Sequence, residues 1–217
     1  MTNATRDDNL RAAGRKALES AALALKKNNF SCSVLEDRAQ AEQYLVNLVG
    51  RGASVGLGGS VTIETLGLRA GLEDAGNTII THTPSMDRET KIKTWLQAQS
   101  ADFYFASPQA VTMKGELILL DGNGNRAAAC IYGPKKVILA AGINKLVKDL
   151  EQGMWRMKNI SAIANNIRLK RDNPCVKTGR CQDCASPERI CNVLTVLQKK
   201  PALTDIEVVL VNEELGY

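Results

Sequence analysis

Short apolar segments alternate with longer amphipathic segments along most of the chain, and this alternation constrains the possible folds most. The apolar runs at residues 136–141 and 206–211 (IEVVLV) are dense in β-branched residues and are typical of buried strands. The segments between such runs place apolar residues at helical spacing, as Leu10, Ala17, Ala21 and Leu25 do. Helices that alternate with short buried strands predict a three-layer α/β domain with a mainly parallel sheet.

The same patterns locate the expected elements. We expect helices over residues 9–27, 39–49, 60–68, 87–99 and 144–167. We expect strands over residues 30–35, 53–57, 78–81, 102–106, 110–113, 115–120, 136–141 and 206–211. The strands at 110–113 and 115–120 are close enough to form an antiparallel hairpin.

Length and composition exclude several classes of protein. The 217 residues are 44% hydrophobic and 24% charged, which predicts one globular domain over residues 1–217. Aromatic residues are only 4%, too few for a single-stranded nucleic-acid platform, so we expect no nucleic-acid partner. No apolar run is long enough to span a bilayer, and residues 1–16 lack the apolar core of an export signal, so we expect a cytoplasmic protein. The net charge of +5 suits a small anionic ligand.

A glycine-rich turn, VGLGGS at residues 55–60, follows the expected strand at 53–57. Glycine lets a backbone approach an anion closely, and α/β folds place ligands at this edge of the sheet. Glu64 is the nearest carboxylate and is a candidate base. The alternative is a tight turn with no ligand, because this is neither a P-loop nor a dinucleotide-binding motif. The candidate ligand-binding residues here are Gly56, Gly58, Gly59, Ser60 and Thr62.

A second polar loop, DGNGNR at residues 121–126, follows another apolar run. Asp121 is a candidate base, and Arg126 can clamp a carboxylate or phosphate. A third loop at residues 142–145 adds Lys145 as a second anion clamp. Since loops that follow parallel strands gather at one edge, we expect 56–60, 121–126 and 142–145 to face one cleft. The other candidate ligand-binding residues are Gly122, Gly124, Asn125 and Asn144, and His82 is a minor candidate.

Four of the six cysteines lie within PCVKTGRCQDCASPERIC at residues 174–191. Their spacing is C-x5-C-x2-C-x6-C, in a polar segment (residues 172–192) that needs a staple to hold one shape. Clustered thiols in a reducing compartment predict a metal site at Cys175, Cys181, Cys184 and Cys191. Four thiolates suit a [4Fe–4S] cluster or zinc, and redox-active or disulfide thiols are the remaining alternative.

Several ordered motifs together resemble the lactate-utilisation (LUD) domain family. They are VGLGGSVTIETLGL at 55–68, ADFYFASPQAVTMKGELILLDGNGNR at 101–126 and YGPKKVILAAGINKLVKDLE at 132–151. KNISAIANNIRL at 158–169, the cysteine segment and LVNEELGY at 210–217 resemble its short, cysteine-containing members. The resemblance implies a Rossmann-like sandwich similar to the ribose-phosphate isomerase and CoA-transferase superfamily. In such folds the early glycine-rich turn holds a phosphate or acyl group, which would place that group at Gly56, Gly58, Gly59 and Ser60.

The resemblance also implies a place in systems that oxidise L-lactate to pyruvate with iron–sulfur partners. We therefore expect an accessory or electron-transfer subunit that binds lactate or a related hydroxy or keto acid, carries a [4Fe–4S] cluster and meets an iron–sulfur or oxidoreductase partner. The chain lacks the long ferredoxin-like region of larger members, so its own status as an enzyme stays open. The alternatives are an isomerase or acyl-transferase-like enzyme with structural zinc, or a redox-sensing binding protein. The sequence is also compatible with a homodimer.

Overall fold

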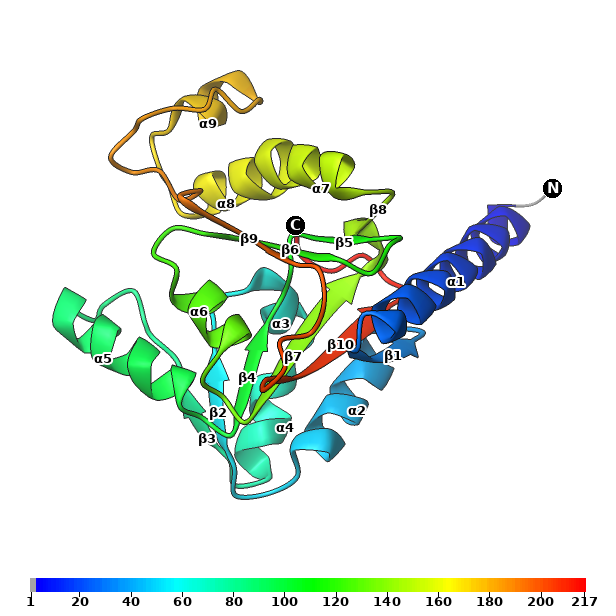
Figure 1. Ribbon diagram of the computed structural model, residues 1–217, viewed down its shortest axis with the longest axis horizontal. Coiled ribbons are helices and arrows are strands. Elements are labelled where there is room, and N and C mark those ends of the chain that lie inside the picture. Colours follow the sequence, from blue (N-terminus) through cyan, green and yellow to red (C-terminus); the bar gives the residue numbers. More distant parts are fainter. Residues whose placement is uncertain (1–2) are drawn as a thin grey trace.

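The computed structural model describes residues 3–217, with side chains from residue 6 onward, and is built on a six-stranded parallel sheet (Figure 1). The strand order is β1-β10-β7-β4-β2-β3, and every neighbouring pair is parallel. The strands are β1 Ser31–Leu35, β2 Ser54–Leu57, β3 Thr78–Ile80, β4 Phe103–Ala106, β7 Lys136–Gly142 and β10 Asp205–Val211. The carboxyl ends of these strands therefore share one edge, where the polar loops follow.

Both faces of this sheet are buried, because alternate residues of each central strand point to opposite sides. Ile138, Ala140 and Val209 pack with α2, α3 and α4 on one face. Leu139 and Val208 pack on the other face with α1, α5 and α6. The helices are α1 Asn3–Lys27, α2 Arg38–Val49, α3 Val61–Thr65, α4 Leu68–Asp74, α5 Arg88–Gln99 and α6 Asn125–Ile131. The expected three-layer, Rossmann-like α/β architecture with a mainly parallel sheet is confirmed.

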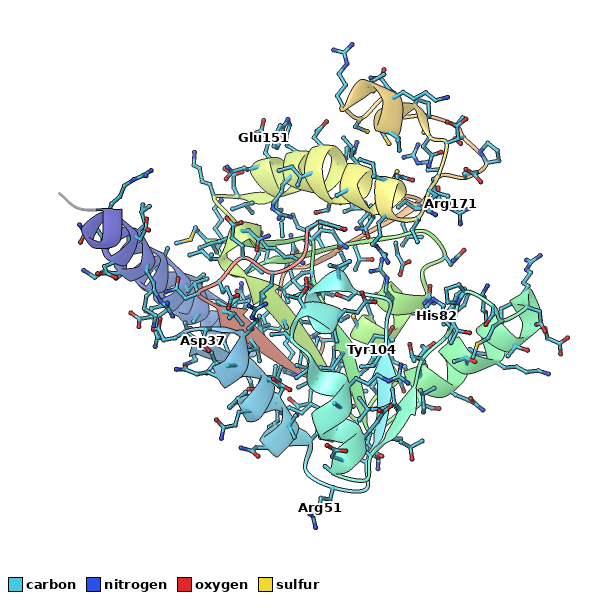
Figure 2. The ribbon with its side chains drawn as sticks, turned by 180° about the vertical axis from the view of Figure 1, so that it is seen from behind. Asp37, Arg51, His82, Tyr104, Glu151 and Arg171 are labelled. Carbon is cyan, nitrogen blue, oxygen red and sulfur yellow. The ribbon has the colours of Figure 1, made fainter. Side chains whose placement is uncertain are left out.

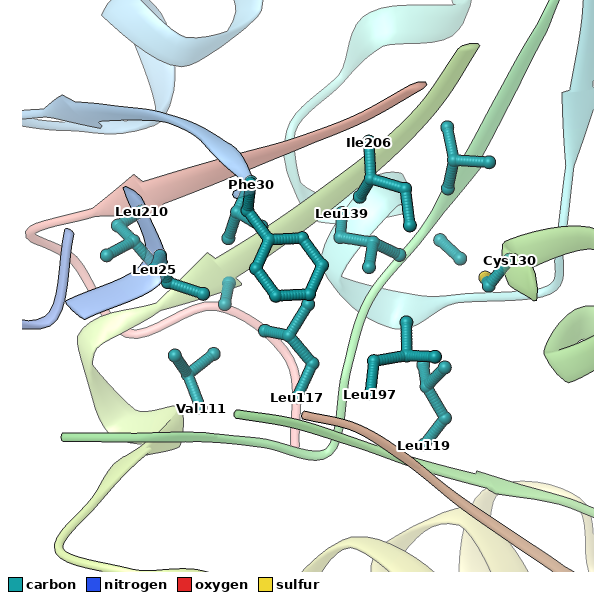
Figure 3. Close-up of a cluster of buried hydrophobic side chains, with 14 of the residues drawn as sticks. Leu25, Phe30, Val111, Leu117, Leu119, Cys130, Leu139, Leu197, Ile206 and Leu210 are labelled. Atoms are coloured by element: carbon teal, nitrogen blue, oxygen red, sulfur yellow. The ribbon is translucent and has the colours of Figure 1, made fainter. Parts of the chain in front are cut away.

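A second, four-stranded sheet lies against the α1 side of the first. Its order is β8-β5-β6-β9, formed by β5 Ala110–Thr112, β6 Leu117–Asp121, β8 Leu146–Val147 and β9 Val193–Leu197. Leu117 and Leu197 from this sheet meet Leu25 of α1 and Leu139 of β7 in one buried cluster (Figure 3). The expected hairpin is present as the antiparallel pair β5–β6.

The opposite face of the second sheet carries a composite helix. It runs through α7 Leu150–Arg156, a π-helical turn η2 Met157–Ser161 and α8 Ala162–Arg168. Met157 and Ala162 pack on Ile118 and Leu120 of β6. The cysteine segment follows, with the short helix α9 Pro174–Thr178 beyond the end of α8, and leads directly into β9 (Figure 1).

Several expected boundaries were wrong for identifiable reasons. The helix expected at 60–68 is divided into α3 and α4, because Gly67 adopts a left-handed conformation with φ of 71°. The helix expected from residue 144 begins only at Leu150, since a 3₁₀ turn η1 Ile143–Lys145 and strand β8 come first. Helix α6 and strand β9 were not expected. No helix in the described part of the chain combines the length and apolar character needed to cross a membrane.

Candidate functional site

A small pocket of about 20 Å³ lies at the carboxyl edge of the central sheet, and we call it the lysine pocket. Residues of the three polar loops meet there, although only the loops at 56–60 and 142–145 follow strands of the parallel sheet, whereas the loop at 121–126 follows β6 of the second sheet. They contribute residues 59–62, Arg126 and Lys145. The full lining is Gly59, Ser60, Val61, Thr62, Ser107, Gln109, Arg126, Lys145, Asn165 and Tyr217.

Lys145 is the central group of the lysine pocket, and only 3% of it is exposed. Its Nζ donates hydrogen bonds to Thr62 Oγ1 and to Ser107 Oγ, each at 2.7 Å. Both hydroxyls donate onward to backbone carbonyls, Thr62 to Leu215 O at 3.2 Å and Ser107 to Pro108 O at 3.3 Å. They therefore act as acceptors toward the amine. Within residues 3–217 no carboxylate forms an ion pair with Lys145.

The electrostatic surroundings of Lys145 favour its neutral form. Burial, together with the positive charges of Arg156 and Arg126, lowers the pKa of its amine to about 7. Arg156 is itself buried and donates to Gln109 O, Asn144 O and Ser161 Oγ. Burial lowers the pKa of Arg156 as well. Lys145 and Arg126 thus line the pocket with Arg156 behind them, and the Asp121 carboxylate lies 3.6 Å from Arg126.

The side chain of Arg126 lies close to Gly58 and lines the lysine pocket. Its Nη2 donates to Leu120 O at 2.7 Å and lies 3.6 Å from Asp121 Oδ1. A Cβ atom added to Gly58 would lie 3.0 Å from Arg126 Cδ and 2.9 Å from Tyr104 Oη. A glycine is therefore needed at position 58 because a larger side chain would collide with Arg126 and Tyr104, and not because a ligand contacts it.

The C-terminal residues lie beside the pocket, because Tyr217 lines it. Asn144 fixes them, because its Nδ2 donates to Gly216 O at 3.0 Å and its Oδ1 accepts from Leu215 N at 3.1 Å. Leu215 is fully buried among α2–α4 and the sheet. Tyr217 then completes the wall of the lysine pocket. Asn144 has a structural role here that the sequence did not indicate.

Several other candidate residues from the sequence analysis do not line the lysine pocket. Glu64 is exposed on α3 and does not line the pocket. The Asp121 carboxylate accepts from Arg126 N and Ala127 N, so it caps the start of α6. Gly122, Gly124 and Asn125 form the turn into α6, and Gly56 packs against Tyr104 and Ala98. Sequence reasoning missed the pocket residues Ser107, Gln109, Asn165 and Tyr217, and also Arg156 behind them.

His82 lies near Gly59, with its ring edge-on to Trp95 at a centroid distance of 5.6 Å (Figure 2). Burial, together with Lys91 and Arg126, lowers the pKa of His82. Its Nδ1 is buried without a hydrogen-bond partner in the described residues. His82 does not line the lysine pocket, and its contacts are mainly those of a packed aromatic ring.

A larger cavity of about 220 Å³ lies on the other side of α8, and we call it the cysteine cavity. All four clustered cysteines line it: Cys175, Cys181, Cys184 and Cys191. Leu120, Met157, Ala162 and Leu194 supply apolar walls, and Lys158, Arg189 and Asp183 lie at its polar part. Within the described residues, no group of three or more His, Cys, Asp or Glu side chains is arranged to hold a metal ion.

Two polar residues hold the cysteine segment in place. Asn166 of α8 donates to Cys175 Sγ at 3.7 Å and accepts from Asn173 Nδ2 at 2.6 Å. Arg189 donates to Cys184 O at 2.6 Å, Cys191 O at 3.2 Å and Asp183 Oδ1 at 3.1 Å. Burial raises the pKa of the Cys175 thiol, and the nearby sulfurs of Cys184, Cys191 and Cys181 raise it further. Burial also raises the pKa of Cys191, against the opposing effect of Arg189.

The two cavities share structural walls. Asn165 lines the lysine pocket, and its neighbour Asn166 lines the cysteine cavity. A second connection runs through Leu120, whose side chain lines the cysteine cavity while its carbonyl accepts from Arg126. Asn192 also joins the cysteine segment to the loop before α6, donating from its backbone N to Asp121 O at 3.0 Å.

Comparisons with known proteins agree with this architecture. No curated protein matches the chain. The fold is similar to that of a DUF162 family protein from Deinococcus radiodurans, with a TM-score of 0.50 and 15% sequence identity. The match covers 93% of this chain and 98% of that one. The model of the LUD domain matches residues 18–211, a span that includes the six parallel strands, both cavities' main walls and the cysteine segment. The chain therefore belongs to the LUD domain family.

Proposed function

We propose that this protein is an iron–sulfur accessory or electron-transfer subunit of lactate utilisation, which binds a small hydroxy or keto acid in the lysine pocket. Family membership supports the general assignment to lactate utilisation. The observation that carries the finer proposal is that four thiols from one short segment line a single cavity.

The arrangement of the thiols favours a cluster over one zinc ion. Zinc holds each of its sulfur ligands at about 2.3 Å, so four cysteines must converge on one point. In a [4Fe–4S] cluster each thiolate binds a different iron, so the cysteines surround a larger volume. The four cysteines here line about 220 Å³ of space, more than a single ion occupies, and this volume supports the cluster.

The lysine pocket supports the proposed anionic ligand. Among the described residues, Lys145 and Arg156 behind it are buried with no ion pair to a carboxylate, and Arg126 has one carboxylate nearby, that of Asp121. Buried positive charge is costly unless an anion compensates it. A small carboxylate can accept hydrogen bonds from Arg126 and from the amine, which makes lactate or a related acid a suitable ligand.

The surface around the cysteine cavity is basic. Residues 158–192 contain seven Lys or Arg and three Asp or Glu, a net charge of +4 within a chain of net charge +5. Lys177, Arg180 and Arg171 of this region are exposed. Such a surface offsets the negative charge of a thiolate-bound cluster and steers an acidic electron carrier toward it.

In this proposal the cluster, when bound, supplies one-electron transfer, and Cys175, Cys181, Cys184 and Cys191 hold it. The rest of the chain positions the ligand and the cluster relative to each other. Asn166 and Arg189 orient the cysteine segment through the contacts described above. Helix α8 keeps the two cavities adjacent, as electron transfer between them requires.

The first test is the iron and acid-labile sulfide content of protein purified without oxygen, together with its visible spectrum. We expect about four irons and four sulfides per chain and a broad visible absorption band. Cys181→Ser should lose most of the iron. Cys32→Ser is the matched control, because Cys32 lies on β1, outside the segment, and should leave the iron content unchanged.

Each other outcome favours a stated alternative. One zinc per chain without colour would contradict the cluster and favour an isomerase or acyl-transferase-like enzyme with a structural zinc. A cluster whose oxidation state changes lactate affinity, without electron transfer to any carrier, would favour a redox-sensing binding protein. Protein that holds no metal after anaerobic purification and reconstitution with iron and sulfide would overturn the proposal and favour thiol chemistry.

A further inference from the structure

We propose that Lys145 forms a reversible imine with the carbonyl carbon of a small 2-oxo acid bound in the lysine pocket. This inference rests on the proposed anion-binding function of that pocket and adds a covalent step and a substrate class to it. It is carried by the placement of one buried lysine, hydrogen-bonded to two hydroxyls, in a pocket that an arginine also lines.

The first requirement of an imine-forming lysine is a free amine. An ordinary exposed lysine is protonated at neutral pH. Lys145 is buried beside Arg156 and Arg126, and its pKa is about 7. About half of its amine is therefore neutral at pH 7, against roughly one part in 2,500 for an exposed lysine with a pKa of about 10.4. Desolvation next to other cations is a known way to activate a lysine nucleophile.

The second requirement is that the lone pair is directed at the ligand. A neutral amine has two N–H groups and one lone pair. Thr62 Oγ1 and Ser107 Oγ accept the two N–H groups, because each hydroxyl already donates to a backbone carbonyl. The remaining position on Nζ belongs to the lone pair. Since Lys145 lines the pocket, that position is available to a carbonyl carbon there.

The third requirement is a group that positions the carbonyl. Arg126 lines the same pocket and can hold the carboxylate that neighbours the carbonyl in a 2-oxo acid. The enclosed part of the pocket, about 20 Å³ between Tyr217 and Gln109, is close to the space of one water molecule, so only the reacting end of a short 2-oxo acid fits there. Glyoxylate and pyruvate have that pairing of carboxylate and carbonyl.

The reaction balances without an oxidant or reductant. The lone pair of Nζ attacks the carbonyl carbon, a C–N bond forms, and the carbonyl π electrons move to oxygen. Both protons from nitrogen pass to that oxygen, which leaves as water when the C=N bond forms. Thr62 and Ser107, within 2.7 Å of the nitrogen, are placed to carry these protons.

The test is reductive trapping. The protein is incubated with pyruvate and sodium cyanoborohydride, and the adduct is counted by intact mass and located by peptide mapping. We expect one adduct per chain, on Lys145, with a trapping rate that rises as the pH increases through about 7. The rise follows from the sign of the shift, because only the deprotonated amine attacks. Lactate, which has the carboxylate but no carbonyl, should compete without being trapped.

The controls separate the covalent step from binding. Lys145→Arg should remove the adduct. Lys136→Arg should retain the adduct. Lys136 forms ion pairs with Asp205 and Glu207. These ion pairs raise the pKa of its amine, although burial alone would lower it. Circular dichroism verifies that both variants are folded.

Two results would overturn the inference in distinguishable ways. If calorimetry shows that lactate and pyruvate bind but wild-type protein gives no adduct, or gives one spread over exposed lysines, the imine is wrong and the anion pocket stands. If neither acid binds, the anion site in the proposed function is wrong, and the imine with it.

Discussion

The adjacent residues Gly58 and Gly59 differ in how much space a side chain would have. A methyl group at Gly58 would lie 2.9 Å from Tyr104 Oη and 3.0 Å from two carbons of Arg126, whereas at Gly59 the nearest atom is His82 Cε1 at 3.6 Å. Gly58→Ala should therefore destabilise the fold by about 1–3 kcal/mol and weaken lactate binding several-fold, because Arg126 is displaced. Gly59→Ala should change stability by no more than about 0.5 kcal/mol. Urea unfolding and calorimetry measure both, and equal effects of the two changes would contradict this account.

Some of the residues around the lysine pocket could be predicted from the sequence, and others could not. Lys145 and Arg126 could be predicted as pocket residues because each follows an apolar run in a polar loop. Arg156 and Asn165 could not, because they lie on a helix that packs against a second sheet, and nothing local marks that helix as a pocket wall. Asp121 was predicted as a base because it is a carboxylate near an arginine, but its oxygens bond the amides at the start of α6.

Helix α8 presents consecutive asparagines to two different cavities, so it offers a matched pair of variants. Asn166→Ala removes the contacts to Cys175 and Asn173 and should cost about 1–3 kcal/mol, with faster loss of iron. Asn165→Ala should instead lower lactate affinity and leave the iron content unchanged. Iron retention and calorimetry on each variant test this division. If both variants change both properties equally, the two cavities are one functional unit.

At the level of elements, the strands of the central sheet were the best predicted. Each is a short apolar run, and a parallel sheet buried on both faces requires that pattern. The second sheet was harder to predict, because β8 has only two residues and β9 follows a polar segment without a clear pattern. Helix α6 contains an alanine-rich stretch, AAACI, and its first amides bond the carboxylate of Asp121, five residues before Arg126, rather than a side chain at the N-cap position, which is Gly124.

At the scale of the whole molecule, the last residues of the described chain link the core to the lysine pocket. Leu215 is fully buried, while Leu203 is 86% exposed. Leu215→Ala should lower the free energy of unfolding by about 2–5 kcal/mol and reduce lactate affinity, because Gly216 and Tyr217 lose their anchor. Leu203→Ala should leave both properties unchanged within error. A Leu215 variant of normal affinity would show that the C-terminal residues do not shape the pocket.

Strand β10 is the last element in chain order, yet it lies inside the sheet, between β1 and β7. During translation, α1 and β1 therefore leave the ribosome long before β10, the strand that joins β1 to the rest of the sheet, has been made. Until residue 211 has been synthesised, the edges of β1 and β7 lack their common neighbour, and the paired residues of β1 and β10 are 176 positions apart in the sequence, as Ser31 and Glu207 are. Contacts so distant in sequence slow folding and leave nascent strand edges open to aggregation. This sheet can therefore be completed only after β10 has been synthesised.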